Sequence, residues 1–452
     1  MKNMKHDVPT RLVKVLNLIL MMVAFGFVWY GYYAARAQVH YYRRGDWVVI
    51  LLFGILYYGF CRSYDAFHIS ISPISEIIYS QTLALIISDF IMYVVIWLLS
   101  LYMPNAVPLL ITFVVQFLIS VLWTFLAHQW YFHNFRPGRT AVIYDLREGM
   151  ESLVGEYGME KKFHIEKVLG VEECLEKLSV LDEMDTVFLS GIHSHERNII
   201  LKYCMYQDIQ VYVIPRIGDV IMGGAKKVHM FHLPMLRIDR YRPIPEYTIA
   251  KRAFDILFSG IAIVIASPFM LVTAIAIKSD GGPALYKQKR LTKDGKEFNV
   301  LKFRSMRVDA EKDGVARLST GDKDDRITPV GKVIRKIRFD ELPQLFNILR
   351  GDMSIVGPRP ERPEIARQYE EEMPEFRLRL QAKAGLTGYA QVYGKYNTTP
   401  YDKLLMDLTY IGTPSLWEDF KICLATVKIL FMPESTEGVA EGATTAMGGE
   451  KH

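Results

Sequence analysis

The sequence predicts a membrane protein of the α plus α/β class, with a four-helix transmembrane bundle, a small Rossmann-like α/β domain and a mainly α-helical C-terminal domain. Three observations predict this order. Hydrophobic residues make up 50% of the 452 residues and concentrate in the first third, short β-rich runs alternate with charged stretches in the middle, and another uncharged run opens the last part. We place the three parts at residues 1–136, 137–240 and 247–432, followed by a Gly/Ala/Thr-rich tail at 433–452 that we expect to be disordered.

Four apolar runs in the first third are predicted to cross the membrane. The first, Val15–Ala35, has 21 uncharged residues, which at about 1.5 Å per helical residue span the roughly 30 Å hydrocarbon core. Its length and its flanks, Lys14 and Arg36, are unlike those of a cleaved signal peptide. The other three runs are Trp47–Cys61, Leu83–Met103 and Ala106–Ala127.

Basic residues predict that both ends of this bundle face the cytoplasm, because they precede the first span and follow the fourth. They are Lys2, Lys5, Arg11, Lys14, Arg136 and Arg139, while Arg36, Arg43 and Arg44 oppose this orientation. Asp89 interrupts the third span, where an ionised side chain is costly. We expect Asp89 to lie near the cytoplasmic end of its span or to be satisfied within the bundle.

The composition gives few other constraints. The formal net charge of +5 is small for this length, so we expect no nucleic-acid partner. The four cysteines lie far apart, without the spacing of a zinc site or a disulfide framework, and indicate reduced thiols in or facing a cytosol.

In the middle part, three β-rich runs at residues 140–144, 185–190 and 209–215 predict a parallel sheet. The turn after the first run lacks Gly-x-Gly-x-x-Gly, so we predict a structural or regulatory domain without a nucleotide.

The uncharged run Ile256–Ile277 has two possible arrangements. Its 22 residues could cross the membrane, but a fifth crossing would place the rest of the chain on the outer face, and cationic residues flank both of its ends. Ser267-Pro268 lies in the middle, where proline removes a backbone hydrogen bond and predicts a kink. Hydropathy leaves open a Pro-kinked transmembrane helix and a re-entrant helix that returns to the same side.

The adjacent acids Asp340 and Glu341 are the candidate site. An exposed acidic pair is usually solvated surface, but here basic residues recur nearby among glycines and prolines, a pattern typical of phosphate pockets. On a helix the two acids would point roughly 100° apart, so one could hold Mg²⁺ while the other attacks phosphorus. The basic residues are Lys302, Arg304, Arg335, Arg338 and Arg359.

Ordered motifs from about Lys251 to Phe431 resemble those of the bacterial polyprenyl-phosphate sugar-1-phosphate transferases, the monotopic phosphoglycosyl transferases. They are KRAFD, the central Ser267-Pro268, GGP followed by Y-x-Q-x-R, KFRSM, DDRIT, RFDELPQL, N-x-L-x-GDMS and VGPRP. The four spans and the α/β domain resemble the large form of these enzymes. Phe339 departs from the family, in which leucine is commoner before the acids.

The resemblance implies residue roles. Asp340 would be the nucleophile, Glu341 would help it hold Mg²⁺, and Arg335 and Arg359 would bind phosphate. Lys302, Arg304 and Arg338 are predicted substrate-binding residues from their placement among glycines and prolines, not from the resemblance. The Ser267-Pro268 break would make residues 249–278 a re-entrant helix in a monotopic catalytic domain. We also expect Lys251, Arg252 and Lys278 to attract anionic lipid headgroups.

The activity implied is transfer of a sugar-1-phosphate, glucose or galactose, from a UDP-sugar to undecaprenyl phosphate at the cytoplasmic face of the bacterial inner membrane. UMP would be released in the first membrane step of exopolysaccharide, capsule or O-antigen synthesis. A glycosyltransferase would release UDP and would need a nucleotide-binding sheet domain, which the sequence does not indicate. The other alternative is a membrane scaffold or regulator with a weakly active or inert C-terminal domain. The bundle and the α/β domain both offer surfaces for a homodimer.

Overall fold

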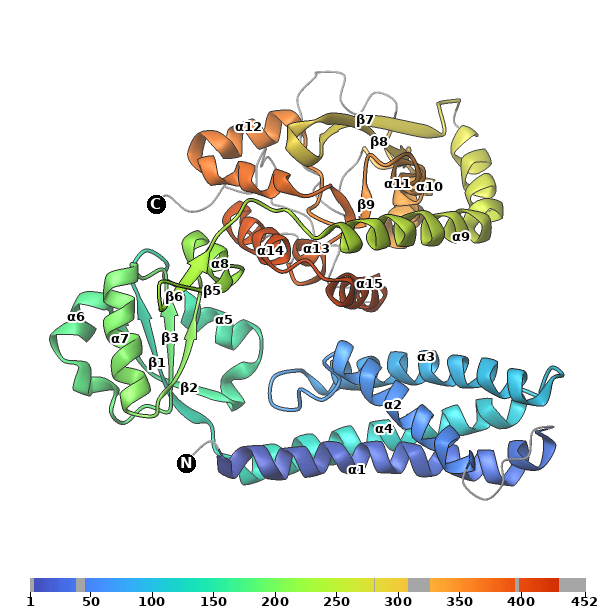
Figure 1. The fold of residues 1–452 in the computed structure, drawn as a ribbon, viewed down its shortest axis with the longest axis horizontal. Helices are drawn as coiled ribbons and strands as arrows, with labels where there is room; N and C mark the ends of the chain where they lie inside the picture. The colour runs from blue at the N-terminus through green and yellow to red at the C-terminus, as the bar shows by residue number, and fades with distance from the viewer. Residues whose placement is uncertain (1–3, 38–44, 280, 308–325, 395–397, 431–452) are drawn as a thin grey trace. The chain divides into compact units, whose positions relative to one another are not determined.

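The computed structural model describes residues 4–37, 45–279, 281–307, 326–394 and 398–430 (Figure 1). The chain forms two compact units, Met1–Ile214 and Pro215–His452. The tail predicted at 433–452, the acids of the DDRIT motif, and Arg43 and Arg44 lie outside the described residues.

The first unit begins with four long apolar helices, each long and apolar enough to cross a membrane. Each helix overlaps its predicted run, although α1 and α3 begin well before Val15 and Leu83, and α3 ends before Met103. Successive helices pack on one another, and α1 also packs on α4. Their bounds are α1 Met4–Val28, which continues as a π turn and a 3₁₀ turn to Arg36, α2 Gly45–Ser63, α3 Ile74–Ser100 and α4 Val107–Asn134.

Polar side chains join these helices. The hydroxyl of Tyr57 on α2 donates to Asn17 Oδ1 on α1 at 2.9 Å, and Ser120 on α4 donates to Gln81 Oε1 on α3 at 2.6 Å. Such hydrogen bonds between helices are common in apolar surroundings. Asp89 corrects our expectation, because α3 starts at Ile74 and places Asp89 midway along the helix instead of near an end. Asp89 is 5% exposed, and neither carboxylate oxygen has a hydrogen-bond partner among the described residues.

The rest of the first unit is a small α/β domain with a fully parallel sheet, which confirms the predicted parallel sheet. The strands lie in the order β2-β1-β3-β4, and alternate residues of β1 and β3 enter two separate apolar cores. The sequence analysis missed β2, in which apolar residues are mixed with polar and charged ones. The bounds are β1 Gly138–Tyr144, α5 Met150–Glu156, β2 Phe163–Gly170, α6 Val171–Glu176, β3 Thr186–Ser190, α7 Ser194–Tyr206 and β4 Gln210–Val213.

The second unit starts earlier than the boundary we expected at residue 240. Helix α8, Ile217–Gly223, packs on α14, Pro400–Gly412, and shares its apolar core. A Cβ on Gly224 would lie 2.7 Å from the Cα of Gly412, so the backbones touch where only glycine fits. Residues 215–240, with the hairpin β5 Lys226–Met230 and β6 Leu233–Arg237, therefore belong to the second unit.

The second unit is mainly helical with two further short sheets. Strands β7 and β8 form an antiparallel hairpin, and β9 pairs with β10 in parallel. The bounds are α9 Pro245–Lys278, β7 Leu285–Leu291, β8 Glu297–Phe303, α10 Pro329–Lys336, α11 Gln344–Arg350, β9 Ser354–Val356, α12 Pro363–Glu372, β10 Gly385–Thr387, α13 Tyr389–Val392 and α15 Leu416–Leu430.

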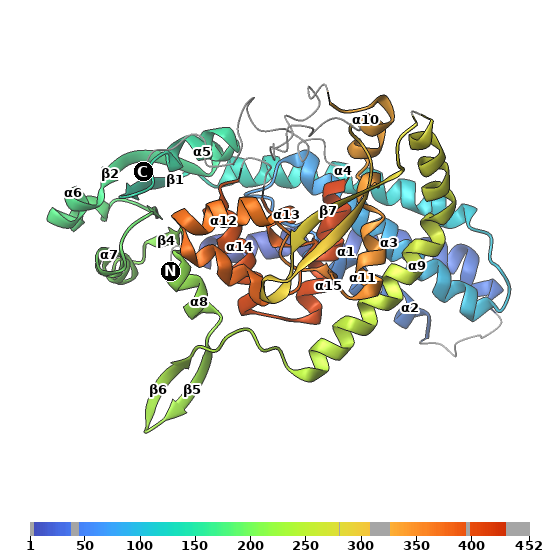
Figure 2. The same cartoon turned by 90° about the horizontal axis from the view of Figure 1, so that it is seen from above.

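Helix α9 contains the fifth apolar run. Only 6% of its most apolar window is buried, against 28–33% for the windows of α1 to α4. The helix changes direction part-way along, as both ribbon views show, and Pro268 lies inside it (Figures 1 and 2). The Ser267 hydroxyl donates to the Val264 carbonyl at 2.8 Å, which gives this side chain a partner within the same helix.

The first half of α9 is tied to the rest of its unit by the KRAFD motif. Lys251 pairs with Asp419 at 3.0 Å, and Arg252 donates to the carbonyls of the last turn of α11 at 2.7 and 2.8 Å. Asp255 accepts from the Ser354 hydroxyl and from a backbone amide of β9. Lys251 is thus paired with an acid, whereas Arg252 bonds neutral carbonyls and keeps its charge, so attraction of these residues to lipid headgroups stays a prediction.

Candidate active site

The acidic turn, which we define as Phe339–Glu341, is a single 3₁₀ turn between α10 and α11. Helix α10 ends just before it, and Arg338 takes a left-handed conformation with φ 53° between the helix and the turn. Neighbouring residues in a 3₁₀ turn point about 120° apart. The two acids therefore diverge somewhat more than the helix we expected would have allowed.

Glu341 lies in a cationic environment. Its Oε1 accepts from Lys302 Nζ at 2.9 Å and lies 3.2 Å from Nη2 of Arg359. Burial raises the pKa of this carboxyl, but the nearby charges of Lys302, Arg359 and Arg338 and the Lys302 hydrogen bond lower it, and the net result is a pKa well below the usual range. Glu341 is therefore an ionised carboxylate.

Asp340 is shifted in the opposite direction. Burial raises the pKa of Asp340 and the adjacent Glu341 charge raises it further, against the opposing effect of Lys302 and Arg335. Two neighbouring acids whose pKa values are moved apart are typical of sites in which the groups have different chemical roles.

The clamped turn, which we define as Gly357–Glu361, supplies Arg359. It follows β9, and its carbonyl oxygens from Pro358 onward each accept a hydrogen bond. The four donors are Gly385 N to Pro358, Arg379 Nη2 to Arg359 and Leu291 N to Glu361, each at 2.9 Å, and Arg290 Nη1 to Pro360 at 3.0 Å.

Both turns border a pocket of about 260 Å³. Three cationic side chains and one carboxylate line it, with the remaining surface from amide, backbone and apolar groups. This balance suits a ligand that carries phosphate groups. The lining residues are Arg290, Val300, Lys302, Glu341, Gln344, Arg359, Pro360, Gly385 and Leu386.

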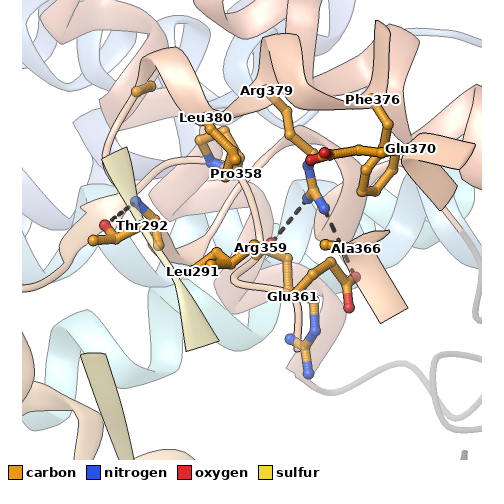
Figure 3. Close-up of a pocket in the computed structure, with 12 residues that line it drawn as sticks. Leu291, Thr292, Pro358, Arg359, Glu361, Ala366, Glu370, Phe376, Arg379 and Leu380 are labelled. Carbon is orange, nitrogen blue, oxygen red and sulfur yellow. Dashed lines mark hydrogen bonds and ion pairs between the residues drawn. The ribbon is translucent and has the colours of Figure 1, made fainter. Parts of the chain in front are cut away.

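A second cavity, of about 320 Å³, lies against the clamped turn (Figure 3). The figure shows the Arg379 guanidinium directed at the main chain of Arg359 and at Glu361. Arg379 lines this cavity, is buried and pairs with Asp407.

Comparison with known proteins places this site in a family. The family described as bacterial sugar transferase matches residues 246–433. The UDP-glucose:undecaprenyl-phosphate glucose-1-phosphate transferase of Caulobacter vibrioides is 40% identical over 201 residues, which cover 43% of this chain and 74% of that protein. The chain belongs to the bacterial sugar transferase family.

Other relatives of this sugar transferase carry different names. The UDP-N-acetylgalactosamine-undecaprenyl-phosphate N-acetylgalactosaminephosphotransferase of Aeromonas hydrophila is 40% identical over 234 residues, 51% of this chain and 54% of that protein. The galactosyl transferase CpsE of Streptococcus agalactiae is 41% identical over 197 residues, 41% of this chain and 43% of that protein. The matches thus cover about half the length of these two relatives.

The structure of this sugar transferase brings together most of the predicted site residues. Lys302 and Arg359 meet Glu341, while Arg335 and Arg338 are near enough to lower the pKa values of Asp340 and Glu341 respectively. Arg304 is used elsewhere: its buried guanidinium donates to the carbonyls of Pro283 and Ile277 at 2.8 and 3.1 Å and secures the end of α9.

Among the residues that line the pocket, the sequence analysis missed two with polar side chains, Arg290 and Gln344. Arg290 lies in the Y-x-Q-x-R motif, which could have identified it, and burial lowers its pKa to about 10. Gln344 opens α11, three residues after Glu341, and lies in the RFDELPQL motif, which could also have identified it.

The acidic turn also suits a magnesium ion. No group of three or more His, Cys, Asp or Glu side chains able to hold a metal occurs within the described part of the chain. Mg²⁺ at phosphate sites is commonly held by one or two carboxylates, completed by waters and substrate phosphates. Asp340 and Glu341 can supply these carboxylates, so the donor set fits.

Proposed function

We propose that this protein transfers a sugar-1-phosphate from a UDP-sugar to undecaprenyl phosphate and releases UMP, the first membrane step of exopolysaccharide, capsule or O-antigen synthesis. The observation that carries the proposal is the pair of adjacent acids with opposite pKa shifts beside the pocket that Lys302 and Arg359 line. The names of the relatives, all sugar or sugar-phosphate transferases, support the same reaction class.

The chemistry proceeds in two displacements. A carboxylate oxygen of Asp340 attacks the phosphorus that bears the sugar, and the bond from this phosphorus to the bridging oxygen breaks, so that UMP leaves with the bond electrons. A phosphate oxygen of the lipid then attacks the same phosphorus, and the Asp340 carboxylate leaves in its original form. Lys302, Arg335 and Arg359 position the phosphates and offset their negative charge. Mg²⁺, held by Asp340 and Glu341, would supply further neutralisation of the diphosphate.

The membrane arrangement follows from the same proposal. We place α1 to α4 as a four-helix transmembrane bundle in the bacterial inner membrane, the Rossmann-like sheet and the second unit on the cytoplasmic face, and α9 as a re-entrant helix broken at Ser267-Pro268. The change of direction in α9, its exposed apolar surface and its cationic flanks support this choice. A soluble sugar nucleotide and a lipid phosphate could then meet at headgroup depth.

Thiol labelling tests the re-entrant helix. Cysteines at Lys226 and Lys293, which are exposed before and after α9, are introduced singly into a Cys423→Ser background and treated with a membrane-impermeant reagent. A re-entrant helix predicts that both positions react only from the cytoplasmic side, in inverted vesicles. Reaction of Lys293→Cys from the opposite side would show that α9 crosses the membrane.

The sugar is tested directly. Relatives named for N-acetylgalactosamine, glucose and galactose transfer are 40–41% identical, so identity does not select one donor. Membranes with the protein, undecaprenyl phosphate and Mg²⁺ are given a panel of UDP-sugars, and UMP and UDP are measured. UMP from one or a few donors is expected; UDP in its place would indicate a glycosyltransferase, and neither nucleotide would favour the scaffold alternative.

A further inference from the structure

We propose that Arg379 and Asp407 form a positioning pair, which holds the main chain of Arg359 so that its side chain reaches the phosphate pocket. This inference rests on the proposed function, because it assigns these residues to the same reaction. Neither residue lines the pocket that contains Glu341.

The pair is buried and directional. The side chains of Arg379 and Asp407 are 4% and 1% exposed, and Asp407 Oδ2 accepts from Nε and Nη2 of Arg379 at 2.8 and 2.7 Å. The same Nη2 donates to the Arg359 carbonyl at 2.9 Å, and Nη1 lies 3.8 Å from a carboxylate oxygen of Glu361 (Figure 3). A buried ion pair contributes little net stability, so its use to fix one carbonyl indicates a geometric role.

The main chain of the clamped turn is also confined by close packing. A Cβ on Gly357 would lie 2.3 Å from the carbonyl oxygen of Lys383, and one on Gly388 would lie 2.2 Å from the carbonyl oxygen of Gly357. With backbone on one side and hydrogen bonds on four successive carbonyls, the turn has little room to move.

The side chain of Arg359 has a different environment. It is 43% exposed and lies 3.2 Å from Glu341 at the pocket. When the main chain is fixed, the guanidinium of a long side chain can occupy fewer positions. A small misplacement of a substrate-binding group can lower the reaction rate about 10²-fold. Loss of the Arg379 fork should therefore displace Arg359 without removing any pocket charge.

The test compares Arg379→Lys with Lys251→Met. A lysine keeps the charge but cannot bond Asp407 and the Arg359 carbonyl in the same fork. Lys251→Met breaks another shielded ion pair of the same unit, with Asp419, which is linked through the Tyr410 hydroxyl to the carbonyl of Val356 but to no residue of the clamped turn by a hydrogen bond among the described residues. We expect hydrogen–deuterium exchange at the backbone amides of residues 357–362 to rise in Arg379→Lys and to stay at the wild-type level in Lys251→Met. Unchanged exchange in Arg379→Lys would overturn the positioning role, whether or not the protein transfers sugar phosphate.

A double-mutant cycle tests the consequence for the reaction. We expect Arg379→Lys to lower kcat/KM for UMP release about 10- to 100-fold, and to have almost no further effect in an Arg359→Ala background. Arg379→Met should lower kcat/KM more than Arg379→Lys does. The same loss in both backgrounds would show a merely structural role and refute the inference, while UMP release by the wild type would leave the proposed function intact.

Discussion

The acidic turn and the clamped turn border the same pocket, but different interactions hold their functional groups. In the acidic turn, opposing charges act on side chains: Lys302 and Arg359 keep Glu341 ionised, while Asp340 is shifted toward its neutral form. In the clamped turn, hydrogen bonds act on the main chain. The surroundings of the acidic turn therefore set the protonation of Asp340 and Glu341, and those of the clamped turn set the position of Arg359. Substitutions in the two turns should differ in how their effects depend on pH.

The largest expected effect is that of Asp340→Asn. An amide cannot act as the nucleophile, so we expect UMP release to fall by at least about 10³-fold and the covalent phosphosugar adduct to disappear from the intact-protein mass. Asp294→Asn is the matched control, because Asp294 is an exposed acid of the same unit that pairs with Arg240. Full activity of Asp340→Asn would contradict the nucleophile assignment.

Glu341→Gln should come next. Removal of this carboxylate takes away one proposed Mg²⁺ ligand and leaves Lys302 and Arg359 without their partner. We expect the Mg²⁺ concentration for half-maximal UMP release to rise about 10- to 100-fold, measured by metal titration. An unchanged Mg²⁺ requirement would remove Glu341 from the metal site.

Lys302→Met should change the pH dependence of activity, which substitutions that act on the clamped turn should not. Asp340 must be ionised to attack, and its pKa is raised, so activity should fall on acidification at a higher pH than an ordinary aspartate would give. Because the Lys302 charge lowers that pKa, its removal should move this acidic limb to still higher pH. The measurement is kcat/KM for UMP release across pH.

Arg379→Lys is the comparison for that profile. The factor by which Arg379→Lys lowers kcat/KM should be similar at every pH, because the substitution moves the main chain of Arg359 and keeps the positive charge at residue 379. If both variants gave the same pH profile, the division between a charge-controlled and a position-controlled turn would be wrong.

Asp89→Asn should have the smallest effect. The amide is nearly the same size as the carboxyl, and Asp89 lies in α3 with no hydrogen-bond partner for its oxygens in the described structure. We expect UMP release within about twofold of wild type, since substitutions that keep packing and remove no paired group usually cost little. A fall in UMP release as large as that expected for Arg379→Lys would indicate that α3 contributes to the reaction.

The sequence predicted those features that are local in the chain. Apolar length predicted all five candidate membrane helices, and the Asp-Glu pair with its basic neighbours predicted the acidic turn. The contacts of Arg379 could not be predicted, because Arg379 follows Arg359 by 20 residues, Asp407 follows Arg379 by another 28, and local sequence patterns do not relate residues so far apart in the chain. Arg304 shows the opposite error, since the sequence does not reveal that its guanidinium is enclosed by the end of α9.

The exposed apolar surface of α9 also determines how the protein can be prepared. Removal of α1 to α4 would leave the second unit with a helix whose most apolar window is only 6% buried, so that fragment would aggregate in plain buffer. A detergent or a nanodisc must cover α9 as well as the N-terminal helices. Solubilisation conditions chosen only for the stability of the N-terminal helices could leave the apolar surface of α9 exposed to water. Activity would then fall on storage before secondary structure is lost.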